Sequence, residues 1–142
     1  MTNRRWTIAA SIVAGLLVGI SGMSTSSAQV PGFKRIELQK QDLGTPGREA
    51  VLARAEFDPG AAVPKHTHPG EEVGFVLEGE LTLEIDGQPA KKLKAGDSFF
   101  VPASQVHAGK NTAKGKTVVV STYIIEKGKP LATMVGAVPA KK

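Results

Sequence analysis

The sequence predicts an all-β fold, a single antiparallel sandwich or barrel, and three observations lead to this prediction. Short segments of alternating apolar and polar residues recur between residues 49 and 126, with turn signals roughly every 8–12 residues. After residue 28 no stretch has the apolar spacing of an amphipathic helix. The chain has 142 residues without an internal repeat, which indicates one modest domain.

The first strands are expected between residues 29 and 85. Residues 29–48 form a polar N-terminal arm, in which the alternation of Ile36 and Leu38 predicts only a short strand. Such an arm is a candidate for pairing with a partner subunit. The barrel itself is predicted over residues 49–126 and begins with a strictly alternating strand. That strand places Val51, Ala53, Ala55 and Phe57 on one face, and further strands follow over 62–68, 72–77 and 81–85.

The second half of the barrel follows a predicted hairpin. Asp86-Gly87 indicates a type I′ turn, with a return strand over 88–93. Short strands are predicted over 98–101 and 106–108, on either side of Pro102. The longest β-branched run follows over 116–126, and residues 127–142 read as a C-terminal tail that frays at its end.

The first 28 residues are typical of a cleavable signal peptide. Arg4 and Arg5 precede an uncharged, mostly apolar run over 8–20, and small residues at 26–28 predict cleavage after Ala28. An uncleaved membrane anchor is the alternative, but the run is short for a membrane span. The paired arginines leave both the general secretory and the twin-arginine routes open. The predicted location is periplasmic or secreted, without a stable membrane anchor after cleavage.

Composition excludes several chemistries. There is no cysteine, and therefore no disulfide, thiolate ligand or cysteine nucleophile. The formal net charge is +5, and lysines cluster at 91–94 and 110–116. We interpret these clusters as solvated loop rims rather than a nucleic-acid footprint, because no DNA-binding motif accompanies them. No nucleic-acid partner is therefore predicted.

All three histidines fall in two ordered stretches. His66 and His68 are two residues apart, so an extended strand presents both rings on the same face. A Pro-Gly turn follows, and the returning strand opens with Glu72, whose carboxylate could then lie beside the two imidazoles. The third histidine is His107. Three imidazoles and one carboxylate form a typical ligand set for a divalent transition metal.

The spacings of both stretches carry a family resemblance. The first reads glycine, five residues, His-x-His, three residues, glutamate, six residues and glycine, at Gly60, His66, His68, Glu72 and Gly79. The second reads Gly96, Pro102, His107 and Asn111, with Ser104 at a turn position where a glycine is usual. These stretches resemble the two motifs of the cupin superfamily, in particular its small single-domain exported members of the conserved-barrel, quercetin dioxygenase-like type.

The resemblance implies a jelly-roll barrel with a metal inside, held by His66, His68, Glu72 and His107. Glu71 competes for the carboxylate role, but only Glu72 also leaves six residues before the closing glycine of the first motif. The ligand set suits manganese, iron, nickel, cobalt, copper or zinc, and affinity alone does not choose among them. Four protein ligands would leave positions open for chemistry or ligand capture.

The expected function is that of a metal-dependent, dioxygenase-like oxidoreductase that acts on a small organic substrate with chelating oxygens. Glu72 is the candidate proton carrier, with a metal-bound water as the alternative. A non-catalytic periplasmic module that binds a metal or small ligand is the second hypothesis. A sensor half of a transcription factor is disfavoured by the leader and by the lack of a helix-turn-helix pattern. Apolar residues on both sides of the 73–77 run predict a homodimer formed through sheet faces.

The interior of the predicted barrel is chiefly aliphatic. Few polar side chains are available there, and no arginine is assigned to it. The expected apolar lining comprises Val51, Val63, Val76, Leu83, Phe99, Val118 and Val120, and the polar candidates are Gln105, Ser121, Thr122 and Tyr123.

Overall fold

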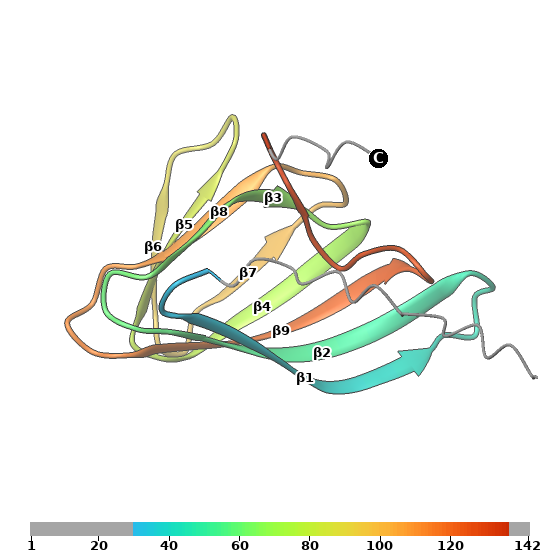
Figure 1. Ribbon diagram of the computed structural model, residues 1–142, viewed down its shortest axis with the longest axis horizontal. Coiled ribbons are helices and arrows are strands. Elements are labelled where there is room, and N and C mark those ends of the chain that lie inside the picture. The colour runs from blue at the N-terminus through green and yellow to red at the C-terminus, as the bar shows by residue number, and fades with distance from the viewer. Residues whose placement is uncertain (1–29, 137–142) are drawn as a thin grey trace, which may run out of the picture.

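The computed structural model describes residues 30–136, and these residues form two antiparallel sheets that face one another (Figure 1). No helix occurs within this range, so none there could cross a membrane. The predicted all-β jelly roll is confirmed, while the predicted leader lies outside the described residues. The strands are β1 (Phe33–Asp42), β2 (Arg48–Phe57), β3 (Ala62–Thr67), β4 (Gly70–Glu78), β5 (Glu80–Ile85), β6 (Lys91–Lys94), β7 (Ser98–Val101), β8 (His107–Asn111), β9 (Thr117–Glu126) and β10 (Thr133–Met134).

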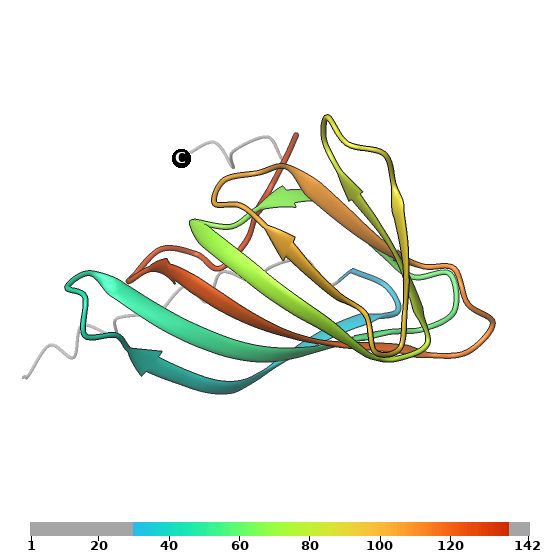
Figure 2. The same ribbon diagram turned by 180° about the vertical axis from the view of Figure 1, so that it is seen from behind.

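Each sheet has five strands. The first sheet runs β1-β2-β9-β4-β7 and the second runs β10-β3-β8-β5-β6. The largest apolar cluster lies between them and contains Phe57, Val63, Val76, Leu81, Leu83, Ile85, Val101 and Val119. Figure 2 shows the same two layers from behind. The core and the candidate site therefore share the space between the sheets.

Strand β9 is the centre of the first sheet and pairs with β2 along its whole length and with β4. Ser121 and Tyr123 point into the barrel and are buried. The prediction that Val120 lines the interior was wrong, because pairing places it opposite the outward-facing Phe75, whereas Val118 is buried. Apolar residues occupy both faces of this strand, so its composition does not reveal which face turns inward.

Strand β1 is longer than the alternation of Ile36 and Leu38 predicts. It has ten residues and pairs antiparallel with β2, with a β-bulge between Glu37 and Gln39. Backbone pairing with β2 therefore extends a strand whose side chains are mostly charged or polar, as is common at a sheet edge. The residues of the predicted arm pair within their own chain.

The segment after β9 returns to the second sheet. It crosses between the two layers, as the red ribbon in Figure 1 shows, and β10 pairs with β3. Thr133 lies opposite Thr67 and Met134 lies opposite His66, and the Val135 amide donates to the Lys65 carbonyl at 2.9 Å. Part of the predicted tail is thus an ordered strand beside the histidines.

Candidate metal centre

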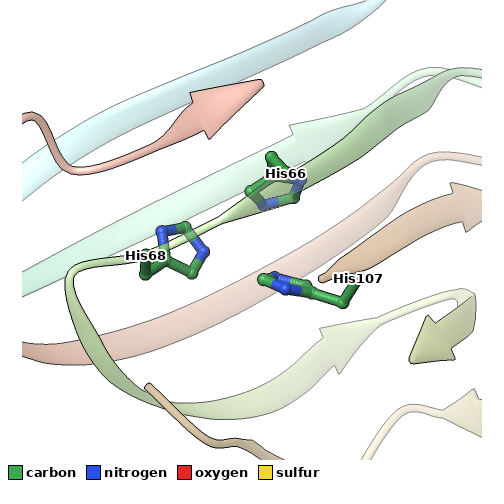
Figure 3. Close-up of side chains that lie close together, drawn as sticks. All are labelled: His66, His68 and His107. Carbon is green, nitrogen blue, oxygen red and sulfur yellow. The ribbon is translucent and has the colours of Figure 1, made fainter. Parts of the chain in front are cut away.

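Three histidines converge on one point inside the barrel (Figure 3). His66 belongs to β3, His68 follows the end of that strand, and His107 begins β8. His66 and His107 are direct partners in the β3–β8 pairing. One ring nitrogen from each histidine lies within 4.8 Å of the others, and all three residues are buried. The His-x-His spacing does place both rings on one side, as the sequence predicts.

The orientation of each ring is fixed by a hydrogen bond to a backbone carbonyl. A carbonyl only accepts, so each Nδ1 must carry the proton and donate. In the neutral tautomer, Nε2 is left as a lone-pair donor that points to the common centre, which is how metal-binding histidines are usually held. The Nδ1-to-oxygen distances are 2.8 Å from His66 to Pro64, 2.5 Å from His68 to Leu131 and 2.9 Å from His107 to Gln105.

Glu72 lies beside the three rings, whereas Glu71 faces outward. The Oε2 atom of Glu72 is 3.2 Å from Nε2 of His68 and 3.3 Å from Nε2 of His107, and the residue is 6% exposed. Glu71 instead accepts a hydrogen bond from the Arg48 guanidinium at 2.7 Å. The alternation of β4 thus separates two adjacent carboxylates, and only Glu72 adjoins the histidines.

The donor atoms around this centre fit a cation. With Nδ1 protonated, the neutral rings direct lone pairs toward a carboxylate that also offers only lone pairs. Nε2 of His68 is buried and has no hydrogen-bond partner, although it lies close to Glu72. Converging acceptors in a buried site repel one another unless protons or a cation lie between them. Three imidazoles and a carboxylate suit a divalent transition metal.

The protonation states of the site favour metal binding at neutral pH. Burial, aided by the charge of His107, lowers the pKa of His66 to about 4. Burial alone would raise the pKa of Glu72, but the adjacent imidazoles of His107 and His68 outweigh it and hold that pKa below its usual range. His66 is therefore neutral and Glu72 ionised, which are the forms that ligate metals.

A cavity of about 1090 Å³ opens beside the cluster. Tyr123 lies on its wall, with its ring centroid 4.7 Å from that of His68. Gln105 is not part of the lining, since its amide donates to the Asp86 carbonyl at 3.1 Å, and Thr122 lies on the outer-facing side of β9. Of the predicted lining, Val63, Leu83, Phe99, Ser121 and Tyr123 reach the cavity.

Two contributors to the site were not predicted from the sequence. Leu131 contributes its backbone carbonyl, a group that every residue has, so the sequence does not indicate this role. Arg35 lines the cavity from β1, a segment that was interpreted as an arm outside the barrel. Only the strand pairing of β1 with β2 brings it to the cavity.

The fold and the site define a small jelly-roll protein with a buried cluster of three histidines and a glutamate. A family model described as a cupin domain matches residues 53–123, a segment that contains all four of these residues. The chain belongs to the cupin family.

Among curated proteins, the chain is 31% identical over 93 residues to the HTH-type transcriptional regulator PuuR of Escherichia coli K12, covering 65% of this chain and 50% of that protein. It is 42% identical over 78 residues to germin-like protein subfamily 2 member 4 of Arabidopsis thaliana, covering 51% of this chain and 36% of that protein. The chain therefore spans half or less of the length of these relatives.

Among solved structures, oxalate oxidase in complex with the substrate analogue glycolate has a TM-score of 0.61 and 25% identity, covering 81% of this chain and 62% of that chain. A cupin-like protein of Thermotoga maritima has a TM-score of 0.61 and 24% identity, covering 78% of this chain and 84% of that chain. The second likeness supports the fold alone.

Proposed function

We propose that this chain is a metal-dependent oxidoreductase, of a dioxygenase-like type, that acts on a small organic substrate with chelating oxygens. The observation that carries the proposal is the convergence of three Nε2 atoms and the Glu72 carboxylate at the wall of a cavity. His66, His68, His107 and Glu72 would hold the ion. When bound, a divalent transition metal would supply Lewis acidity and, if redox-active, electron transfer.

The residues around the ion have separable roles. The three backbone-anchored rings fix the ligand geometry, and apolar side chains form part of the cavity wall beside them. Glu72 is the group placed to accept or return a proton, because it is ionised and lies at the cavity. Burial, with a contribution from Glu72, raises the pKa of the Tyr123 hydroxyl, which therefore stays protonated and can donate to a substrate oxygen.

A non-catalytic binding module is the second candidate. One observation favours it: among the described residues that line the cavity, Glu56 and Asp58 are the only carboxylates besides Glu72. Glu56 is engaged at the rim by Arg54 at 3.0 Å and by Lys116 at 3.5 Å. A module would therefore use the same ligands to capture a metal or small molecule without turning it over.

The deciding experiment begins with the metal. Elemental analysis of the protein purified from its natural compartment is expected to find one divalent transition ion per chain. The metal-loaded protein is then tested for dioxygen consumption with catechols, flavonols and 1,3-diketones. Turnover supports the oxidoreductase, whereas tight binding without dioxygen consumption favours the module.

Ligand variants test the site itself. His107→Ala is expected to lose metal affinity by at least roughly ten- to a hundredfold, and to lower the thermal midpoint in excess metal but little in chelator. Glu71→Ala is the matched control, because Glu71 faces away from the histidines and its partly exposed pairing with Arg48 is expected to contribute about 1 kcal/mol or less. Full metal retention by His107→Ala, or metal loss in Glu71→Ala with retention in Glu72→Ala, would overturn the assignment.

The proposal includes a periplasmic or secreted location and no nucleic-acid partner. Both parts follow from sequence features, the location from a leader outside the described residues. Mass spectrometry of the exported protein is expected to find Gln29 at the N-terminus, and retention of Met1 or Thr2 would contradict cleavage. Specific DNA binding by the purified protein would instead support a role in transcriptional regulation, which is the role that the name of the relative PuuR states.

A further inference from the structure

Cationic side chains gather at the same cavity as the histidine cluster. Lys34, Arg35 and Lys116 line it, together with His66 and Glu72. A cavity that receives only a neutral chelating molecule has no need of a guanidinium. These cations differ in whether they point into the barrel and in whether an acidic side chain pairs with them.

The register of β1 turns Arg35 toward the interior. Directly paired residues of antiparallel strands project from the same face. Arg35 pairs with Ala55, which packs against the main core cluster, and the neighbouring inward pair, Phe33 with Phe57, has ring centroids 4.9 Å apart. Lys34 pairs with Glu56 and so projects from the opposite face. Arg35 is thus the cation of β1 that points into the open side of the barrel.

Arg35 also differs from Lys116 and Glu72 in its partners. Lys116 lies 3.5 Å from Glu56, and Glu72 is engaged by His68 and His107. Within residues 30–136, no salt bridge or side-chain hydrogen bond engages the Arg35 guanidinium. Its charge reaches the deep wall of the cavity, since it opposes the rise in the pKa of Tyr123.

We propose that Arg35 binds a carboxylate of the substrate, a group separate from the oxygens that chelate the metal. This inference rests on the proposed function and narrows its substrate class to small organic acids. A guanidinium presents paired N–H donors that match a carboxylate in a bidentate fashion, which an ammonium does not. The cavity, about 1090 Å³, has room for an aromatic ring between the two contacts.

The test uses two probes that share a chelating end. The catechol oxygens of 3,4-dihydroxybenzoate and 3,4-dihydroxybenzamide both address the metal, and only the first carries a carboxylate at the other end. Binding to manganese-loaded protein is measured by calorimetry at low salt for wild type, Arg35→Gln and Arg35→Lys. We expect Arg35→Gln to weaken the acid by roughly tenfold or more while the amide is unchanged, with partial rescue in Arg35→Lys.

Controls separate this inference from the proposed function. Lys92→Gln removes an equal charge on β6 away from the cavity and is expected to affect neither probe. Metal content must match wild type in every variant, because Arg35 is not a ligand. Equal loss of acid and amide, or no loss of either, in Arg35→Gln overturns the inference while leaving the metal site intact. Failure of both probes to bind metal-loaded wild type overturns the proposed chelating substrate and the inference with it.

Discussion

Asn111 shows how one buried amide can hold several loops together. The two N–H groups of its Nδ2 are shared among the carbonyls of Phe57 and Asp58, both at 3.1 Å, and of Gly115 at 2.8 Å, and its Oδ1 accepts from the Ala113 amide at 2.8 Å. The residue is completely buried. Its position in the second motif thus serves the loops at the end of β8 rather than the histidine cluster.

Asn111→Asp should destabilise the fold. The substitution replaces a donor by an oxygen that faces carbonyls, and unsatisfied buried groups cost roughly 1–3 kcal/mol each, more when charged. The free energy of unfolding, measured in urea, is expected to fall by at least this amount. Lys110→Gln at the exposed neighbouring position is expected to change it by less than about 0.5 kcal/mol. An Asn111→Asp variant as stable as Lys110→Gln would contradict this role.

His66 gives the metal-free protein a defined pH dependence. Its pKa is 6.5 in the unfolded chain and about 4 in the fold, so the unfolded state binds the extra proton more readily between these values. The contribution of neutral His66 to stability is therefore complete above pH 6.5 and is lost as the pH falls toward 4. Urea unfolding of chelator-treated protein at several pH values should show this decline. His66→Gln should flatten it, and an unchanged slope in that variant would refute the explanation.

At the scale of elements, Gly74 in β4 makes room for the Phe99 ring of β7. A Cβ at this position would lie 2.0 Å from the ring, and Phe99 also lines the cavity. The missing side chain therefore lets an aromatic ring pack against the strand next to the candidate site.

Gly74→Ala is expected to cost roughly 1–3 kcal/mol, because Phe99 must leave its place. The same change in a Phe99→Ala background should cost much less, since the clash has been removed. A double-mutant cycle from urea unfolding measures this coupling. Equal costs in the two backgrounds would show that the ring is not what constrains Gly74.

How far the sequence predicts each element depends on how local its signal is. The β3–β4 unit holds both a fixed His-x-His spacing and a turn, so the approach of His66, His68 and Glu72 could be predicted from the chain alone. The inward face of β9 could not be predicted, because apolar residues occupy both of its faces and its register is set by distant β2 and β4. The same holds for Leu131 and Arg35, whose places depend on pairing at the sheet edges.

At the scale of the whole molecule, the outer face of the first sheet carries an exposed apolar patch. It lies over β4 and β7, and its members are Val73 (47% exposed), Phe75 (43%), Leu77 (50%) and Phe100 (54%). Contiguous apolar patches of this kind commonly mark interaction sites. The patch is consistent with the homodimer predicted from the sequence, which stays a prediction.

Sedimentation equilibrium at micromolar concentration tests this assembly. We expect the wild-type protein to have the mass of two chains and Phe75→Glu to have the mass of one, because a carboxylate would be buried at the centre of the patch. Leu43→Glu, in the loop after β1, should remain dimeric. A single-chain mass for wild type would contradict the dimer.

The central place of β9 has a consequence for biosynthesis. β2 and β4 are separated in the sheet only by β9, which the ribosome makes after both of them. Until Thr117–Glu126 has emerged, each lacks one of its two hydrogen-bonded neighbours, and the first sheet cannot be completed. Non-local strand pairing of this kind delays folding. A nascent chain that ends before residue 117 should therefore stay protease-sensitive and, if it is exported through the general secretory route, should reach the translocon unfolded.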